Sequence, residues 1–210
     1  MIVYTVNIGG YDHTKHLEGF EGYYVTDQKA PEGWKEIKID NIWGLPSAAI
    51  AKLVKIKPEM FFDIPDGETI VYHDANLIPK NLEEFVDKHE SDFSVFKHGS
   101  DFSIYKELDL CKNHRRKYIN VPALDKQGEY YINAGCPNMP YPTVLNCVII
   151  RRNNLHTRRL STQWWQDIAK HQSWRDQPSL RYVLYLDKQD INLIPHEEKK
   201  KYFGSKNHVR

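Results

Sequence analysis

The stretch that decides the fold is "TIVYHDANLIP", residues 69–79, in which strand-forming residues run into a carboxylate and an amide. The branched and aromatic residues from Thr69 to Tyr72 predict a buried strand. Asp74 and Asn76 follow two residues apart, so on an extended chain their side chains point to the same side. Such a strand places oxygen atoms at the end of a sheet, where open α/β proteins bind their ligands.

Strands and helices alternate on either side of this stretch. We expect strands over residues 2–7, 22–27, 69–76, 93–98 and 143–153. We expect helices over residues 46–60, 81–89, 103–112, within 122–135, and over 162–171 and 177–186. This alternation predicts one α/β domain over residues 1–210, with a mixed sheet and helices on both faces. Residues 191–210 lack periodicity and are expected to form a tail that packs over the rest.

Composition narrows the classes of protein to consider. The chain has 210 residues, of which 40% are hydrophobic and 27% charged, and its formal charge of +1 gives no reason to expect a nucleic-acid or membrane partner. Its three cysteines have no C-x-x-C spacing, which disfavours a disulfide framework and a zinc site and fits a reducing compartment. No apolar run is long enough for a membrane span, and the N-terminus lacks an export signal, so a soluble cytoplasmic protein is expected.

Asp74 and Asn76 have two interpretations. Together they offer oxygen ligands to a hard divalent cation such as Mg²⁺ or Mn²⁺, whose remaining positions a diphosphate can fill. His208 is a candidate third ligand, and Lys206 a candidate partner for phosphate. The alternative is that Asp74 caps the turn, Asn76 is an ordinary turn residue and the terminal histidine belongs to no site.

A second informative stretch is "WRDQPSLRYVL", residues 174–184. Arg175, Asp176 and Gln177 stand at the start of a predicted helix, where a helix N-terminus stabilises an anion or a reacting centre. Asp176 or Gln177 could therefore face a substrate. The alternative is a structural salt bridge between Arg175 and Asp176, with Asp176 as the helix cap.

Five segments, in this order, resemble a known family. They are "VYTVNIGGYD" (3–12), "VYHDANLIP" (71–79), "FKHGSDFSIYKE" (96–107), "YINAGCPNMPYPTVLNCVIIRRNN" (131–154) and "WWQDIAKHQSWRDQPSLRYVL" (164–184). The chain resembles the glycosyltransferase-like family formerly catalogued as a domain of unknown function, to which a plant seed-mucilage hexosyltransferase belongs. The match in order over residues 3–184 is stronger support than any single segment.

The resemblance implies a GT-A fold, which is a Rossmann-type domain that binds a nucleotide-diphosphate sugar. It also implies a metal ion, Mn²⁺ or Mg²⁺, held by a D-x-D-type motif. Here that motif is Asp74-Ala75-Asn76, so its second acid is an amide. The pair Asp176-Gln177 resembles the pair that lies beneath the anomeric carbon in retaining transferases of the glycogenin-like type.

Other site residues follow from their places at strand ends or in these segments. Those expected on the donor side are Thr5, Tyr11, Asp27 and Lys206, with residues 191–210 packing over the donor site. Those expected on the acceptor or phosphate side are His98, Arg175 and one of Arg151 and Arg152, for which core or surface roles are the alternative.

The sequence thus predicts a metal-assisted glycosyltransferase whose donor is a nucleotide-diphosphate sugar. A saccharide acceptor is favoured over a modified DNA base, because paired tryptophans such as Trp164 and Trp165 more often lie in a core than on a nucleic-acid surface. The alternative function is a non-catalytic nucleotide- or sugar-binding module on the same fold.

Overall fold

The computed structural model of the chain describes residues 1–12, 21–40, 44–113, 120–188 and 190–205. Its strands are β1 (Ile2–Asn7), β2 (Gly22–Thr26), β3 (Trp34–Lys38), β4 (Thr69–His73), β5 (Leu77–Pro79), β6 (Phe93–Lys97), β7 (Val144–Arg152), β8 (Asn192–Ile194) and β9 (Phe203–Ser205). Its helices are α1 (Ser47–Ile56), the 3-10 turn η1 (Pro58–Met60), α2 (Leu82–His89), α3 (Ile104–Asn113), α4 (Val121–Asn133), α5 (Leu155–His171), α6 (Asp176–Asp187) and α7 (Glu198–Tyr202).

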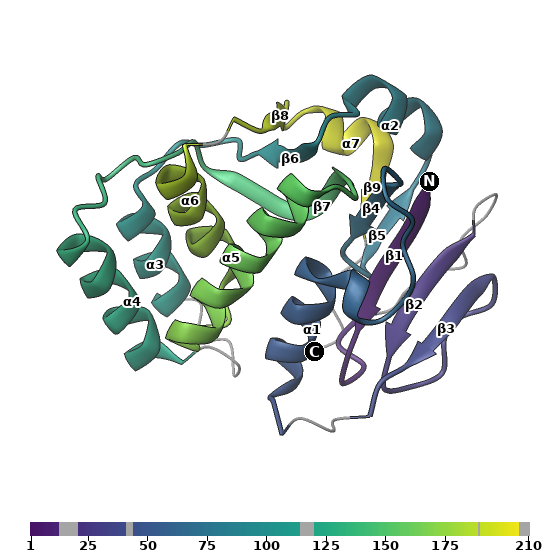
Figure 1. Ribbon diagram of the computed structural model, residues 1–210, viewed down its shortest axis with the longest axis horizontal. Helices are drawn as coiled ribbons and strands as arrows, with labels where there is room; N and C mark the ends of the chain where they lie inside the picture. The colour runs from purple at the N-terminus through teal and green to yellow at the C-terminus, as the bar shows by residue number, and fades with distance from the viewer. Residues whose placement is uncertain (13–20, 41–43, 114–119, 189, 206–210) are drawn as a thin grey trace.

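Seven of the described strands form one mixed sheet in the order β3-β2-β1-β4-β7-β6-β8 (Figure 1). Within this sheet β7 runs antiparallel to both of its neighbours, and the other pairs are parallel. The amino end of β7 therefore lies at the same edge as the carboxyl ends of β1, β2, β4 and β6. We call this the carboxyl edge of the sheet.

The strand order reverses between β1 and β4. The chain adds β2 and β3 outward on one side of β1 and then returns through α1 to place β4 on the other side. Such a reversal leaves a crevice at the carboxyl ends of the two central strands, which is where open α/β sheets bind ligands. The residues that follow β1 and β4 therefore frame the expected ligand position.

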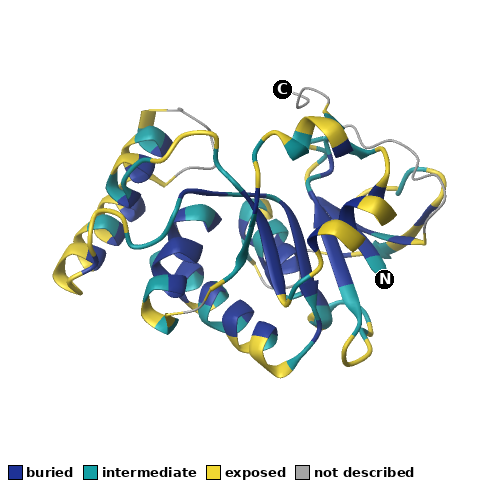
Figure 2. Ribbon diagram, turned by 90° about the horizontal axis from the view of Figure 1, so that it is seen from above, coloured by how far each residue is buried: buried dark blue, intermediate teal, exposed yellow. Residues whose placement is uncertain are grey.

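Helices cover both faces of the sheet because successive strand side chains point to opposite faces. Tyr4, Ile70 and Ile149 belong to a cluster that packs under α1, α5 and α6. Val71 and Val148 face the other way and pack with α2, α7 and β9. Figure 2 shows the central strands in the colour of buried residues, with exposed positions on the outer turns of the helices. The predicted α/β class, with a mixed sheet covered on both faces, is confirmed.

A third buried cluster lies away from the sheet, between α3, α4 and α6. Figure 1 places α3 and α4 at one end of the molecule and β2 and β3 at the other. The helices α5 and α6 lie between these ends and contact each other.

Several element boundaries differ from the sequence prediction for local reasons. The first helix ends at Ile56 rather than at residue 60, because the residue before Pro58 leaves helical geometry. The helix expected over residues 162–171 begins at Leu155, where Asn154 and Thr157 form a capping box. Residues 192–205, expected as an irregular tail, form β8, α7 and β9.

Candidate functional site

The candidate site begins at Asp74, the residue after β4. Its backbone N–H donates to the Cys147 carbonyl of β7 over 2.8 Å, which fixes the strand end against the neighbouring strand. Its side chain lies on the same side as Tyr72, whose hydroxyl donates to Oδ1 of Asp74 over 2.8 Å. The Asp74 side chain is 35% exposed, so its carboxylate stands at the rim of the carboxyl edge and not in the core.

Two lysines of α1 meet Asp74 and Asp176. The Lys55 ammonium lies 2.7 Å from Oδ2 of Asp176 and 3.7 Å from Oδ1 of Asp74. The Lys52 ammonium lies 2.9 Å from Oδ1 of Asp176. Residues three apart share one face of a helix, so α1 presents both lysines to the same carboxylate. Asp74 and Asp176, which the sequence assigned separately to the phosphate and the sugar, are thus parts of one charged cluster.

Burial and charge set the protonation states in this cluster. Burial alone would raise the pKa of Asp176, but the ammoniums of Lys52 and Lys55 outweigh it and hold the pKa well below its usual range. Burial lowers the pKa of Lys52, against the opposing pull of Asp176. For Lys55, burial is overcome by Asp176 and then Asp74, and its pKa is raised. Asp176 is therefore a carboxylate, and Lys55 an ammonium, at neutral pH.

Gln177 is fixed by hydrogen bonds at both ends of its amide. The Arg175 guanidinium donates to Oε1 of Gln177 over 3.0 Å, and Nε2 of Gln177 donates to the Val144 carbonyl over 3.1 Å. The carbonyl of the preceding residue, Asp176, accepts from the indole of the fully buried Trp164 over 2.8 Å. These contacts hold the start of α6 against the amino end of β7. The N-cap position of α6 is Arg175, without a side-chain cap bond, so Asp176 is not the helix cap of the alternative interpretation.

Asn146 of β7 stands between the two ends of the cluster. The backbone carbonyl of Val144 accepts a hydrogen bond from the Gln177 amide, and the carbonyl of Cys147 accepts one from the N–H of Asp74. Asn146 is only 2% exposed, yet neither its Oδ1 nor its Nδ2 has a hydrogen-bond partner among the described residues. A buried amide left unpaired costs about 1–3 kcal/mol, so we expect a bound water molecule or a ligand to complete its hydrogen bonds.

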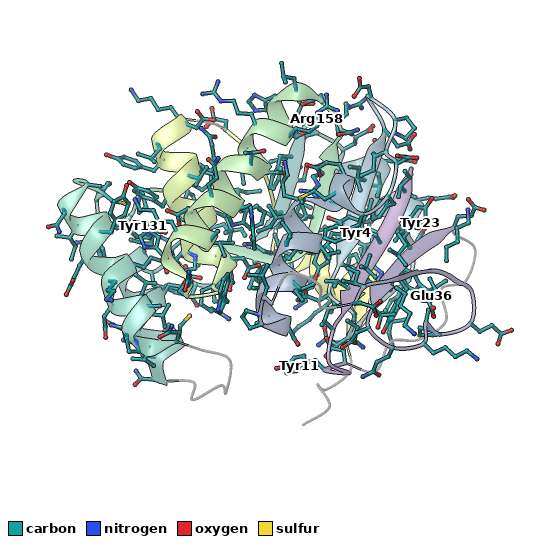
Figure 3. The ribbon with its side chains drawn as sticks, turned by 60° about the horizontal axis from the view of Figure 1, so that its bottom comes forward. Tyr4, Tyr11, Tyr23, Glu36, Tyr131 and Arg158 are labelled. Carbon is teal, nitrogen blue, oxygen red and sulfur yellow. The ribbon has the colours of Figure 1, made fainter. Side chains whose placement is uncertain are left out.

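A glycine turn closes the other side of the switch point. Gly9 and Gly10, which follow β1, have positive φ angles of 75° and 64°. Both carboxylate oxygens of Asp27 accept from the Gly9 N–H over 3.0 Å, so Asp27 holds the turn in place. A Cβ on Gly10 would lie 2.6 Å from Nε2 of Gln28. Tyr11 follows this turn and lies at the rim of the molecule (Figure 3).

Thr5 occupies a place different from the one predicted. Its side chain is fully buried, and its hydroxyl donates to the His73 carbonyl over 2.7 Å. This bond continues the pairing of β1 with β4 beyond Tyr4. Thr5 therefore has a structural role at the switch point in place of the predicted contact with the nucleotide.

Arg151 is also structural. It pairs with Ile70 near the amino end of β4, away from the carboxyl edge. Its buried guanidinium donates to the carbonyls of Lys55 and Ile56 and to the hydroxyls of Tyr4 and Ser161. These hydrogen bonds hold the end of α1 against the sheet. Arg151 therefore has a structural role and not the predicted role on the acceptor or phosphate side. Arg152, the other arginine of that prediction, forms an ion pair with Glu90 near the amino end of β4.

His98 does lie at the carboxyl edge, after β6. Its backbone N–H donates to the Thr143 carbonyl over 2.8 Å, and its Nδ1 lies 3.0 Å from the N and O atoms of Ser100. Its ring centroid is 6.2 Å from that of His196, which follows β8. The sheet order separates β6 from β4 by β7, so His98 lies to one side of the Asp74 cluster.

Two predicted residues, Lys206 and His208, lie outside the described residues. The last described residue before them is Ser205 of β9, which pairs with Leu77 of β5. Leu77 comes three residues after Asp74. The described chain therefore ends beside the segment that leaves the candidate site.

The described part of the chain offers only an incomplete set of ligands for a divalent cation. No group of three or more histidine, cysteine, aspartate or glutamate side chains is arranged there to hold a metal ion. Asp74 supplies one carboxylate, Asn76 supplies an amide, and an ammonium already lies 3.7 Å from that carboxylate. The described residues by themselves do not fit a divalent metal site.

Sequence reasoning missed Lys52, Lys55 and Asn146. A signal for the lysines was present, because both lie in the apolar run "AAIAKLVKI" (residues 48–56), where Lys55 falls at a buried position. A lysine on the buried face of a helix needs a partner. Asn146 gave no comparable signal. The sequence alone does not show whether an asparagine in a strand is buried or lacks a hydrogen-bond partner, because that depends on residues that pack against it in the fold.

Comparisons with known proteins identify a family and a solved structure with limited similarity. The model of a family described as "TOD1/MUCI70, glycosyltransferase-like domain" matches residues 66–208, which is more than half of the chain. A crystal structure of the galactosyltransferase LgtC in complex with donor and acceptor sugar analogues is similar over 89% of this chain and 70% of that chain, with 10% identity and a TM-score of 0.45. No curated protein matches the chain by sequence. Among the described residues, no helix has the length and apolar character that a membrane crossing requires.

Proposed function

The chain belongs to the TOD1/MUCI70 glycosyltransferase-like domain family, and on that premise we propose that it transfers a sugar from a nucleotide-diphosphate sugar to an acceptor. The observation that carries this proposal is the single charged cluster formed by Asp74 and Asp176 through Lys55 at the carboxyl edge. The family was predicted from the order of its segments, and that prediction is confirmed.

Sugar transfer requires both a negative and a positive group in the site. Breaking the bond between a sugar and a diphosphate builds positive charge at the anomeric carbon and negative charge on the leaving phosphate. Asp176 is an ionised carboxylate that stabilises the first, and the ammoniums of Lys52 and Lys55 stabilise the second. Lys52 is 22% exposed, which leaves it accessible to a ligand.

The neighbouring residues supply recognition. The unpaired amide of Asn146 offers one donor group and one acceptor group to the hydroxyls of a sugar. Gln177, clamped by Arg175 and the Val144 carbonyl, presents a fixed amide beside it. The Gly9 turn, held by Asp27, lets a nucleotide approach the backbone closely at the end of β1.

Several finer parts of the sequence prediction stay predictions. A Mn²⁺ or Mg²⁺ ion bound to Asp74 and Asn76 would act as a Lewis acid on the diphosphate, with His208 as a further ligand. Because the described residues do not complete such a site, we derive no step through the ion. The saccharide acceptor, the cytoplasmic location, the role of Lys206 and the packing of residues 191–210 over the donor site also stay predictions.

A second candidate function is a non-catalytic binding module. One observation favours it, because each oxygen of Asp176 is already paired with a lysine, as in a structural ion-pair network. In that case the cluster would bind a nucleotide or a sugar without turnover.

Slow donor hydrolysis distinguishes the two functions. The protein is incubated with a panel of nucleotide-diphosphate sugars, once with Mn²⁺ and once with EDTA, and the release of nucleoside diphosphate is measured. A transferase releases the diphosphate from at least one donor, and Asp74→Asn removes this release. The matched control is Asp66→Asn, because Asp66 is an exposed aspartate paired with Arg158. Tight binding without release from any donor supports the module, and no binding of any donor overturns both.

A further inference from the structure

The negative charge of Asp74 has a positive charge beside it, the ammonium of Lys55. Its ammonium lies 3.7 Å from Oδ1 of Asp74, the same oxygen that accepts from the Tyr72 hydroxyl. It also lies 4.9 Å from the centre of the Tyr72 ring, within the range of a cation–π contact. The carboxylate that a metal ion would need is therefore already next to a positive charge.

This positive charge is held firmly. The Lys55 side chain is 4% exposed and lies 2.7 Å from Oδ2 of Asp176, whose own side chain is equally buried. Moving the ammonium away would leave the buried Asp176 with less positive charge around it, supplied by Lys52 and Arg175. Separating a buried ion pair leaves an uncompensated charge and is strongly unfavourable.

The charge of the motif matches a monovalent cation. Asp74 contributes one negative charge, and Asn76 is neutral. The affinity of oxygen sites for divalent ions rises with the number of charged ligands, so replacing an acid by an amide weakens a divalent ion more than it weakens an ammonium. An ion bound directly to Asp74 would also lie close to the Lys55 ammonium and be repelled by it.

We propose that the Lys55 ammonium is a built-in cation at the Asp74 end of β4 that takes the electrostatic role of a divalent metal ion. The part of this inference that concerns a diphosphate rests on the proposed function. The part that concerns Asp74, Asn76 and Lys55 does not, because it is a statement about which cation the carboxylate binds.

The first test titrates Mn²⁺ alone into the wild-type chain and into Asp74→Asn, with the electron paramagnetic resonance signal of free Mn²⁺ as the readout. The expected result is that the two proteins bind Mn²⁺ equally weakly. Mn²⁺ binding by the wild-type chain that Asp74→Asn removes overturns the proposal.

The second test rebuilds a divalent site. In the double variant Lys55→Gln with Asn76→Asp, a second carboxylate is present and the ammonium is gone, so we expect Mn²⁺ to bind. Asn76→Asp alone keeps Lys55 and should bind Mn²⁺ at least about tenfold more weakly than the double variant. Equal binding by these two proteins shows that Lys55 does not exclude the ion and overturns the proposal.

The control for the double variant combines Asn76→Asp with Lys35→Gln. Lys35 belongs to β3 and forms an exposed ion pair with Glu21. This control should bind Mn²⁺ like Asn76→Asp alone. Circular dichroism checks the fold of each variant. If Lys55→Gln does not fold, the comparison of the wild-type chain with Asp74→Asn decides alone.

A third measurement concerns the diphosphate. Uridine, guanosine and adenosine diphosphates are titrated into the wild-type chain in EDTA and in Mn²⁺ by calorimetry. The proposal expects dissociation constants that agree within about threefold, and a gain of more than about tenfold in Mn²⁺ overturns it. If none of these nucleotides binds, the proposed function loses its support, while the Mn²⁺ titration still decides the role of Lys55.

Discussion

The ammonium of Lys55 lies 2.7 Å from Oδ2 of Asp176, although the two residues come from different helices, α1 and α6. Both helices pack on the same face of the sheet. The pair therefore joins the end of β4, through Asp74, to the start of α6. The same contact that organises the candidate site also holds two parts of the fold together.

Asp176→Asn tests the structural weight of this contact. The change leaves the buried ammonium of Lys55 and the largely buried one of Lys52 without their shared carboxylate, so we expect the free energy of unfolding to fall by about 3 kcal/mol. Urea denaturation at pH 7 measures this loss. Glu21→Gln, which removes one partner of an exposed pair, should change stability by less than about 1 kcal/mol. A similarly small effect of Asp176→Asn would contradict the buried network.

The same carboxylate gives a pH dependence. Because the folded-state pKa of Asp176 is held below its unfolded value, its contribution to stability is present at neutral pH and is lost as the pH falls below about 4. The wild-type chain should therefore lose more stability between pH 5 and the acid limit than Asp176→Asn does. Parallel curves for the two proteins would show that Asp176 is not ion-paired in solution.

Asn146→Ala separates binding from stability. Because the Asn146 amide has no hydrogen-bond partner among the described residues, its removal should leave stability unchanged or raise it by up to about 1 kcal/mol, while donor binding weakens. Thermal unfolding and nucleotide-sugar titration measure the two effects.

Asn153→Ala is the matched control for this prediction. Asn153 is a buried asparagine one residue past the same strand, and its amide donates to the carbonyls of Ile64 and Pro65. Its truncation should cost about 1–3 kcal/mol of stability, because two buried carbonyls lose their donor. If Asn146→Ala destabilises the protein as much as Asn153→Ala does, the Asn146 amide is structural.

Asp27→Ala should loosen the turn after β1. Asp27 accepts from the Gly9 N–H with both oxygens, and this charge-assisted contact is worth about 1 kcal/mol at an exposed position. We expect nucleoside diphosphate binding to weaken about tenfold, with little change in the far-UV circular dichroism spectrum. Asp40→Ala, at another exposed position near the same end of the sheet, serves as the control. Unchanged affinity in Asp27→Ala would place the nucleotide away from this turn.

Glu107→Gln tests a second buried contact, between Glu107 of α3 and Arg181 of α6. Burial raises the pKa of Glu107 to about 7, although the Arg181 guanidinium, 3.1 Å away, opposes the shift. The folded state therefore holds this proton over a pH range in which the unfolded chain has lost it. Stability should fall as the pH rises from about 5 to about 7, by up to about 3 kcal/mol.

The variant removes the titrating group but keeps an acceptor for Arg181. The difference in unfolding free energy between the wild-type chain and Glu107→Gln should therefore shift in favour of the variant as the pH rises. Urea denaturation at pH 5 and at pH 7.5 measures this shift. A difference that does not depend on pH would show that Glu107 is ionised throughout.

The sequence was sufficient for the parts of the fold that depend on local pattern. Branched and aromatic runs located β1 and β4, and the acid after β4 pointed to the edge of the sheet at which the candidate site lies. The edge strand β3 was missed, because it is short and only Trp34 among its residues is buried, so it carries almost no hydrophobic pattern.

The residues of the candidate site were harder to predict, because their partners are distant in the sequence. Thr5 and Arg151 are polar residues in strands, and nothing in their local sequence shows that backbone carbonyls of β4 and α1 receive their hydrogen bonds. Lys55 was missed for the same reason. Its partners are Asp74 and Asp176, and only the packing of α1 against the sheet brings the three together.

The pairing of β9 with β5 has a consequence for biosynthesis. Tyr202 and Phe203 pack their rings against Phe85 of α2, at centroid distances of 5.1 Å each. The ribosome makes α2 more than a hundred residues before these two aromatics. A nascent chain therefore exposes this apolar surface of α2 until Tyr202 and Phe203 have been made, and such transiently exposed surface favours aggregation or chaperone binding during synthesis.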